Sequence, residues 1–127
     1  MAVTHTVLRQ YADSSSNRIQ LSETVTGGTE KNLDMSIAVG TDTLVAFTLD
    51  RSILKSLCLS SDVALTVKTN SSGAPTDTIA LAAGQTLVWT LATDLLAKCP
   101  ITANITALYI TNAAAGAAAF KLRSLSN

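Results

Sequence analysis

Apolar residues recur at every second position along most of this 127-residue chain. In the segment 32–39, Leu33, Met35, Ile37 and Val39 alternate with polar or small residues, and the segments 63–68 and 120–123 repeat the pattern. Successive side chains of a β-strand point to opposite faces of a sheet. This period of two therefore predicts strands that bury one face and expose the other.

Clusters of turn-forming residues divide the chain into about nine short strands. The first break is the segment 13–17, whose short polar side chains compete for backbone hydrogen bonds. Gly27 and Gly28 follow the second strand, and we predict that they form a two-residue hairpin turn, because glycine adopts positive φ readily. The expected strands cover residues 4–11, 19–25, a segment that ends at 39, 44–49, 63–69, 79–81, 87–91, 105–111 and 118–125.

One or two short helical turns are expected between these strands. Residues 53–57 have apolar positions at helical spacing, and Asp50 or Ser52 can cap that turn. Residues 93–98 begin with a capping side chain and precede a proline, which stops a helix. Neither segment is long enough for more than a turn or so.

Many short strands without long helices between them are typical of an all-β fold. We predict an antiparallel β-sandwich, jelly-roll or Ig-like, or a related barrel, in a single domain over residues 1–127. Residues 1–13 have a strand pattern and end at the first turn cluster, so they are candidates for an extending N-terminal arm. The expected core residues lie on the alternating apolar rows: Phe47, Leu65, Val67, Leu81, Trp89 and Leu122.

The composition describes an uncharged surface. Basic and acidic residues number 9 each, the formal net charge is zero, and no basic stretch is present to neutralise phosphates. We therefore expect no nucleic-acid binding. No run reaches the roughly 18 apolar residues of a membrane span, and the first ten residues lack an apolar run of signal-peptide length, so neither membrane insertion nor export is expected.

The residue types that carry catalysis do not form a recognisable group. His5 is the one histidine and lies near the N-terminus, without the nucleophile and orienting group that a triad needs. Gly27 and Gly28 lack the sequence context of a phosphate-binding loop. Most acidic residues fall at predicted turns or on solvated faces: Asp13, Glu23, Glu30, Asp34, Asp42, Asp50, Asp62, Asp77 and Asp94. We predict no catalytic or cofactor-binding residues and no enzymatic activity.

The two cysteines, Cys58 and Cys99, are too few for the dense disulfide framework of a small secreted domain. We expect two reduced, buried thiols that behave as small apolar residues. A metal site is not expected, because one histidine and no CxxC or HxxxH spacing do not supply a ligand set.

Aromatic residues offer an alternative function. Tyr11, Trp89 and Tyr109 can stack on a sugar, and the turn 71–76 can contact a glycan. Trp89 lies inside an apolar run and the tyrosines are isolated, so strand and core packing is the preferred interpretation. A carbohydrate- or receptor-binding module of a tail, fibre or pilus is the alternative to a structural role.

The C-terminal half resembles the small capsid cement, or decoration, proteins of tailed bacteriophages. The likeness covers about half of the chain. It consists of the strand at 62–70, an L-x-x-G turn before the Trp89 strand, the Y-I-T-N sequence at 109–112 and the strand at 120–123.

The resemblance implies a β-sandwich that assembles on the outside of a capsid, as a homotrimer, and reinforces the shell by bridging coat subunits. The implied partner is the major capsid protein, and the implied location is the capsid surface of the virion. No binding residues are transferred, because no interface motif is matched.

Overall fold

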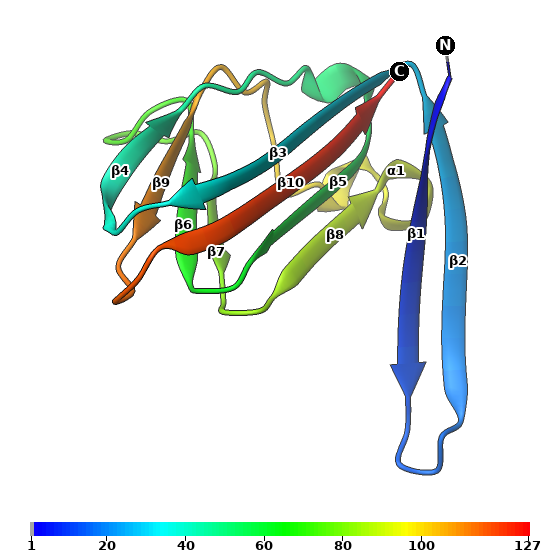
Figure 1. Ribbon diagram of the computed structural model, residues 1–127. Coiled ribbons are helices and arrows are strands. Elements are labelled where there is room, and N and C mark those ends of the chain that lie inside the picture. The colour runs from blue at the N-terminus through cyan, green and yellow to red at the C-terminus, as the bar shows by residue number, and fades with distance from the viewer. Residues whose placement is uncertain (1) are drawn as a thin grey trace.

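Ten antiparallel strands and three short helical turns make up residues 2–127, which the computed structural model describes (Figure 1). The predicted all-β sandwich is confirmed, with one strand more than the expected nine. The elements are β1 (Val3–Ala12), β2 (Arg18–Gly27), β3 (Thr29–Ile37), β4 (Gly40–Val45), η1 (Arg51–Ile53), β5 (Leu54–Ser61), β6 (Leu65–Thr69), β7 (Thr78–Leu81), β8 (Thr86–Thr90), α1 (Leu91–Asp94), η2 (Leu96–Lys98), β9 (Leu108–Asn112) and β10 (Ala118–Ser126).

Strands β3 to β10 form two four-stranded sheets. Sheet I has the order β3-β10-β5-β8, and sheet II has the order β4-β9-β6-β7. Apart from β6 and β7, no two of these strands that follow one another in the chain are neighbours in a sheet. Eight strands that pass repeatedly between two antiparallel sheets are the wiring of a jelly roll. Of the two sandwich types left open by the sequence pattern, the structure has the jelly roll.

The core lies between the two sheets. All six predicted core residues are buried, together with Ile37, Ile110 and Phe120. Two predictions for the first inward row are wrong: Met35 and Val39 are exposed. Met35 lies on the edge strand β3, and Val39 lies in the short link between β3 and β4, outside both sheets.

The predicted hairpin at Gly27 and Gly28 is also wrong. β2 pairs with β1, whereas β3 pairs with β10. These glycines instead permit a close approach to the C-terminal strand. A Cβ atom on Gly27 would overlap the carbonyl oxygen of Ser126, and the Gly28 N–H donates to the same oxygen at 2.9 Å.

The helical turn expected at residues 53–57 lies earlier, at Arg51–Ile53, because residues 54–57 pair with β8 and β10 as part of β5. The second helical region lies close to its predicted position. The Asp50 carboxylate accepts the Ser52 N–H at 2.9 Å and caps η1, after which the chain continues directly into β5. α1 begins at Leu91, so Thr93 and Asp94 lie in its turn and do not cap it as expected. This shift gives Asp94 another role, which is described below.

We expect Trp89→Ala to lower the free energy of unfolding by about 3–5 kcal/mol, because it opens a large cavity in the core. Trp89 is among the largest fully buried side chains, and its indole N–H donates to the Leu95 carbonyl at 2.9 Å. Chemical denaturation measures the loss. The control Leu44→Ala, at an exposed position of β4, should change stability by less than about 0.5 kcal/mol. A loss below about 1 kcal/mol for Trp89→Ala would contradict its role as a core anchor.

Candidate functional site: the N-terminal arm

Residues 3–27 form a two-stranded hairpin, here called the arm, that stands at one side of the sandwich. Ten cross-strand pairs run from Val3–Gly27 to Ala12–Arg18. Figure 1 shows the turn at 13–17 projecting beyond the end of the sandwich. The Asp13 carboxylate accepts the backbone N–H groups of Ser15 and Asn17, each at 2.9 Å, and these bonds hold its pKa below the ordinary value.

The arm has two chemically different faces. Residues directly opposite in an antiparallel pair share a face, so the register places the odd-numbered residues of both strands together. We call this the inner face, because near the arm's root its side chains are half-buried against the sandwich. Towards the turn the same face carries Leu21, Tyr11 and Ile19, of which Tyr11 is 71% and Ile19 78% exposed. The even-numbered outer face is polar apart from Leu8, Ala12 and the methyl groups of four threonines.

An ion pair fixes the root of the arm to α1. The Arg9 guanidinium donates to both oxygens of the Asp94 carboxylate, at 2.8 and 2.5 Å. Asp94 also accepts the Thr90 N–H at 2.7 Å. The hydrogen bonds from Arg9 are the main reason that the pKa of Asp94 falls to about 2. Glu23, on the inner face of β2, accepts the hydroxyls of Thr90 and Thr93, each at 2.9 Å.

Further bonds attach the root to sheet I. His5 Nε2 lies 2.5 Å from Glu30 Oε2, which makes this hydrogen bond the principal cause of the lowered pKa of Glu30. Asn32 donates to the other Glu30 oxygen at 2.7 Å, and Lys55 Nζ donates to the Thr26 carbonyl at 2.8 Å. The arm is therefore tied to α1, β3 and β5.

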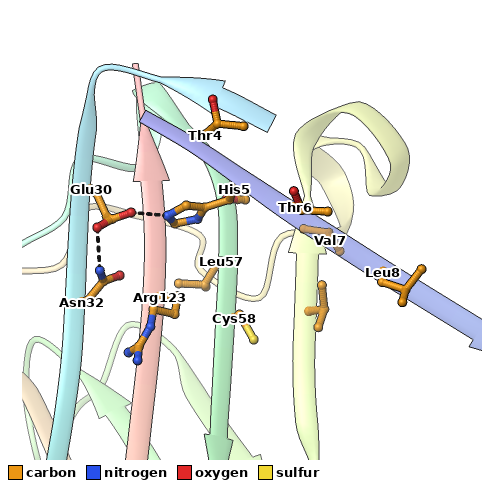
Figure 2. Close-up of a pocket in the computed structure, with 12 residues that line it drawn as sticks. Thr4, His5, Thr6, Val7, Leu8, Glu30, Asn32, Leu57, Cys58 and Arg123 are labelled. Atoms are coloured by element: carbon orange, nitrogen blue, oxygen red, sulfur yellow. Dashed lines mark hydrogen bonds and ion pairs between the residues drawn. The ribbon is translucent and has the colours of Figure 1, made fainter. Parts of the chain in front are cut away.

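A groove of about 500 Å³ lies between β1 and the outer face of sheet I (Figure 2). One wall consists of five consecutive β1 residues, Thr4–Leu8. The floor includes Cys58, Val88 and Arg123, and Arg123 is paired with Asp34 through two 2.9 Å hydrogen bonds. Burial raises the pKa of the Cys58 thiol, which disfavours the nucleophilic thiolate. The groove therefore suits binding of a polypeptide segment better than a chemical reaction.

All nine acidic residues considered in the sequence accept hydrogen bonds that support the fold or the arm. Asp42 pairs with Lys68 at 3.0 Å, Asp62 accepts the Ala119 N–H at 2.7 Å, and Asp77 accepts the Thr102 N–H at 2.8 Å.

Within residues 2–127, no group of three or more histidine, cysteine, aspartate or glutamate side chains is placed to hold a metal ion. Among the same residues, no helix is long and apolar enough to cross a membrane.

The three candidates for sugar stacking lie in different parts of the fold. Trp89 is buried in the core, Tyr109 is half-buried on β9, and Tyr11 is exposed near the tip of the arm. The turn 71–76 is closed by its own hydrogen bonds, including Ala74 N–H to Ser71 Oγ at 3.1 Å. The structure does not bring the aromatic residues together.

The alternation of residues 4–11 predicts a strand but does not by itself identify β2 as its partner. The available signal was symmetry: two alternating segments flank the turn at 13–17 at equal distance, so that Tyr11 faces Ile19 and Arg9 faces Leu21. No protein-family model matches this chain, and comparisons with curated proteins and with solved structures found no match either.

Loss of the Asp94 charge should weaken the fold in a defined pH range. The folded-state pKa of about 2 lies below the ordinary 3.8, so the ionised carboxylate stabilises the protein above pH 3.8, and this contribution disappears as the pH falls towards 2. We expect about 1–2 kcal/mol, reduced by the partial exposure of the pair to water. Denaturation of the wild type and Asp94→Asn across this range should show a smaller pH dependence in the variant; equal slopes would contradict the role of the pair.

We expect Cys58 and Cys99 to be reduced in the functional protein. Both are free thiols in the structure, and burial raises the pKa of each. Alkylation under denaturing, non-reducing conditions should add two labels by mass, while alkylation of the folded protein should be much slower. A chain that takes up no label after denaturation would contain a disulfide.

Proposed function

We propose that this protein is a non-enzymatic structural protein of a phage virion, which binds the outside of the capsid and stabilises it by bridging coat subunits. The observation that carries the proposal is the arm: a braced two-stranded element that extends an apolar face beyond its own domain. The resemblance of the C-terminal half to capsid cement proteins supplies the particle and the partner, the major capsid protein.

An exposed arm of this kind is best explained by contact with another subunit. Isolated two-stranded ribbons are marginally stable in water, and the tip of this arm has no layer behind it. Fully covering an exposed isoleucine contributes about 1.5–3 kcal/mol. Ile19 is 78% and Tyr11 71% exposed, so the tip can support a firm contact. The root bonds of Arg9 and Glu23 hold the arm in place before that contact forms.

The surface of the sandwich also suits permanent packing on other subunits. The chain has no net charge, and only 14% of its residues are charged. Such a surface provides little electrostatic repulsion between neighbours in an assembly. Within a shell, the jelly roll would supply a rigid body and the arm a connection to the adjoining subunit. The resemblance implies a homotrimer, and sedimentation of the purified protein distinguishes that state from the dimer proposed below.

Particles that lack the protein should release their genome at a lower temperature than complete particles, and adding the purified protein should restore the difference. Ile19→Lys should weaken this rescue strongly, because it places a charge on the apolar inner face of the tip. Gln20→Lys is the matched control, since it adds the same charge at the neighbouring position on the outer face. Both positions are exposed in the single chain, so both variants should fold, which far-ultraviolet circular dichroism checks.

Rescue that fails with wild-type protein would contradict the capsid-stabilising role. Equal rescue by Ile19→Lys and Gln20→Lys would remove the arm tip from the mechanism.

A further inference from the structure

The edge of β1 that faces away from β2 is open along the groove. Within residues 2–127, the only strand paired with β1 is β2. Side chains of one strand face would contribute every second residue to a neighbouring cavity, whereas residues 4, 5, 6, 7 and 8 all line this groove. The groove therefore runs along the backbone edge of β1.

The register identifies which backbone groups lie on that edge. The Asp13 N–H donates to the Asn17 carbonyl at 2.9 Å at the end of the ladder. Pairs in an antiparallel ladder alternate between those that exchange hydrogen bonds and those that do not, so odd-numbered residues bond across to β2. The N–H and C=O groups of Thr4, Thr6 and Leu8 consequently point away from β2, into the groove.

The opposite edge of the arm, on β2, is partly occupied. Its outward groups obey the same parity: Lys55 donates to the Thr26 carbonyl, and the Gly28 N–H donates to the Ser126 carbonyl. Leu91 and Ala92 of α1 lie alongside residues 23–26. A further strand is therefore better accommodated at β1 than at β2.

We propose that the open edge of β1 pairs antiparallel with β1 of a second copy of this chain, around a two-fold axis, to form a four-stranded sheet with the order β2-β1-β1-β2. An antiparallel edge is complementary to itself, as an isologous interface requires. The only permanently charged residue of β1, Arg9, is already neutralised by Asp94, so like charges do not oppose the pairing.

This arrangement covers both the open edge of β1 and the exposed apolar tip of the arm. A two-fold axis perpendicular to the ribbon keeps the two inner faces on the same side, and antiparallel pairing places the tip of one arm beside the root of the other. The inner face of each tip, with Tyr11 and Ile19, then lies over the groove above sheet I of the other copy. The Tyr11 ring would approach Arg123, whose planar guanidinium suits stacking on an aromatic face.

The mass of the purified protein in solution, without capsids, tests this pairing independently of the proposed function. Sedimentation over a concentration series should give twice the 13.2 kDa chain mass. Thr6→Pro removes an N–H from the open edge and should raise the dimer dissociation constant by more than about tenfold. Its mate across the ladder, Thr24, lies on β2 and has no group on that edge. Thr24→Pro, directly across the ladder, is therefore the matched control and should leave the dimer intact.

Tip variants provide a second measurement that does not alter the backbone. Tyr11→Lys on the inner face should dissociate the dimer, and Gln10→Lys on the outer face should not. Far-ultraviolet circular dichroism and melting temperature establish that each variant is folded. A wild-type monomer or trimer, or a dimer that responds equally to Thr6→Pro and Thr24→Pro, would overturn the proposal.

Discussion

The projecting arm depends on one constraint: its root must be fixed before its tip can present a surface. The Arg9–Asp94 ion pair supplies this attachment, and Asp94 is itself positioned by the Thr90 N–H. The next residue, Leu95, accepts the indole N–H of Trp89 through its carbonyl. A short path thus connects the arm to the largest side chain of the core.

Leu95, in this path, has an unfavourable backbone conformation. Its φ of 66° and ψ of 157° lie in a region that is essentially restricted to glycine, and its side chain is 63% exposed. The conformation persists because its N–H donates to the Leu91 carbonyl while its own carbonyl is held by Trp89. The fold therefore keeps an unfavourable backbone conformation directly after Asp94, the residue that pairs with Arg9 of the arm.

Much of the sandwich was predictable, because alternation is a local signal and the core rows obey it. Trp89, Phe47 and Leu122 are buried as their spacing predicts. The jelly-roll wiring was not predictable, since it depends on pairing between segments far apart in the chain. The predicted hairpin at Gly27 is wrong for the same reason. The two glycines favour a local turn, but β3 pairs with the distant C-terminal strand β10.

The arm was only half predictable. A strand at residues 4–11 and a break at 13–17 follow from the sequence, but the structure was needed to show that β2 is its partner and that the sandwich ends before the tip. The acidic residues illustrate the same limit. Asp94 and Glu23 are 71 residues apart, yet both meet Thr90 at the arm root, and no local pattern reveals that meeting.

We propose that the arm is an incomplete sheet, which another subunit completes. Residue-resolved amide hydrogen exchange tests it most directly, because the parity of β1 separates the two edges. We expect the odd-numbered amides of β1 to be protected at all concentrations, and those of Thr4, Thr6 and Leu8 to become protected only when the protein assembles. Exchange at these three amides that stays fast in the assembled protein would show that no strand adds to this edge.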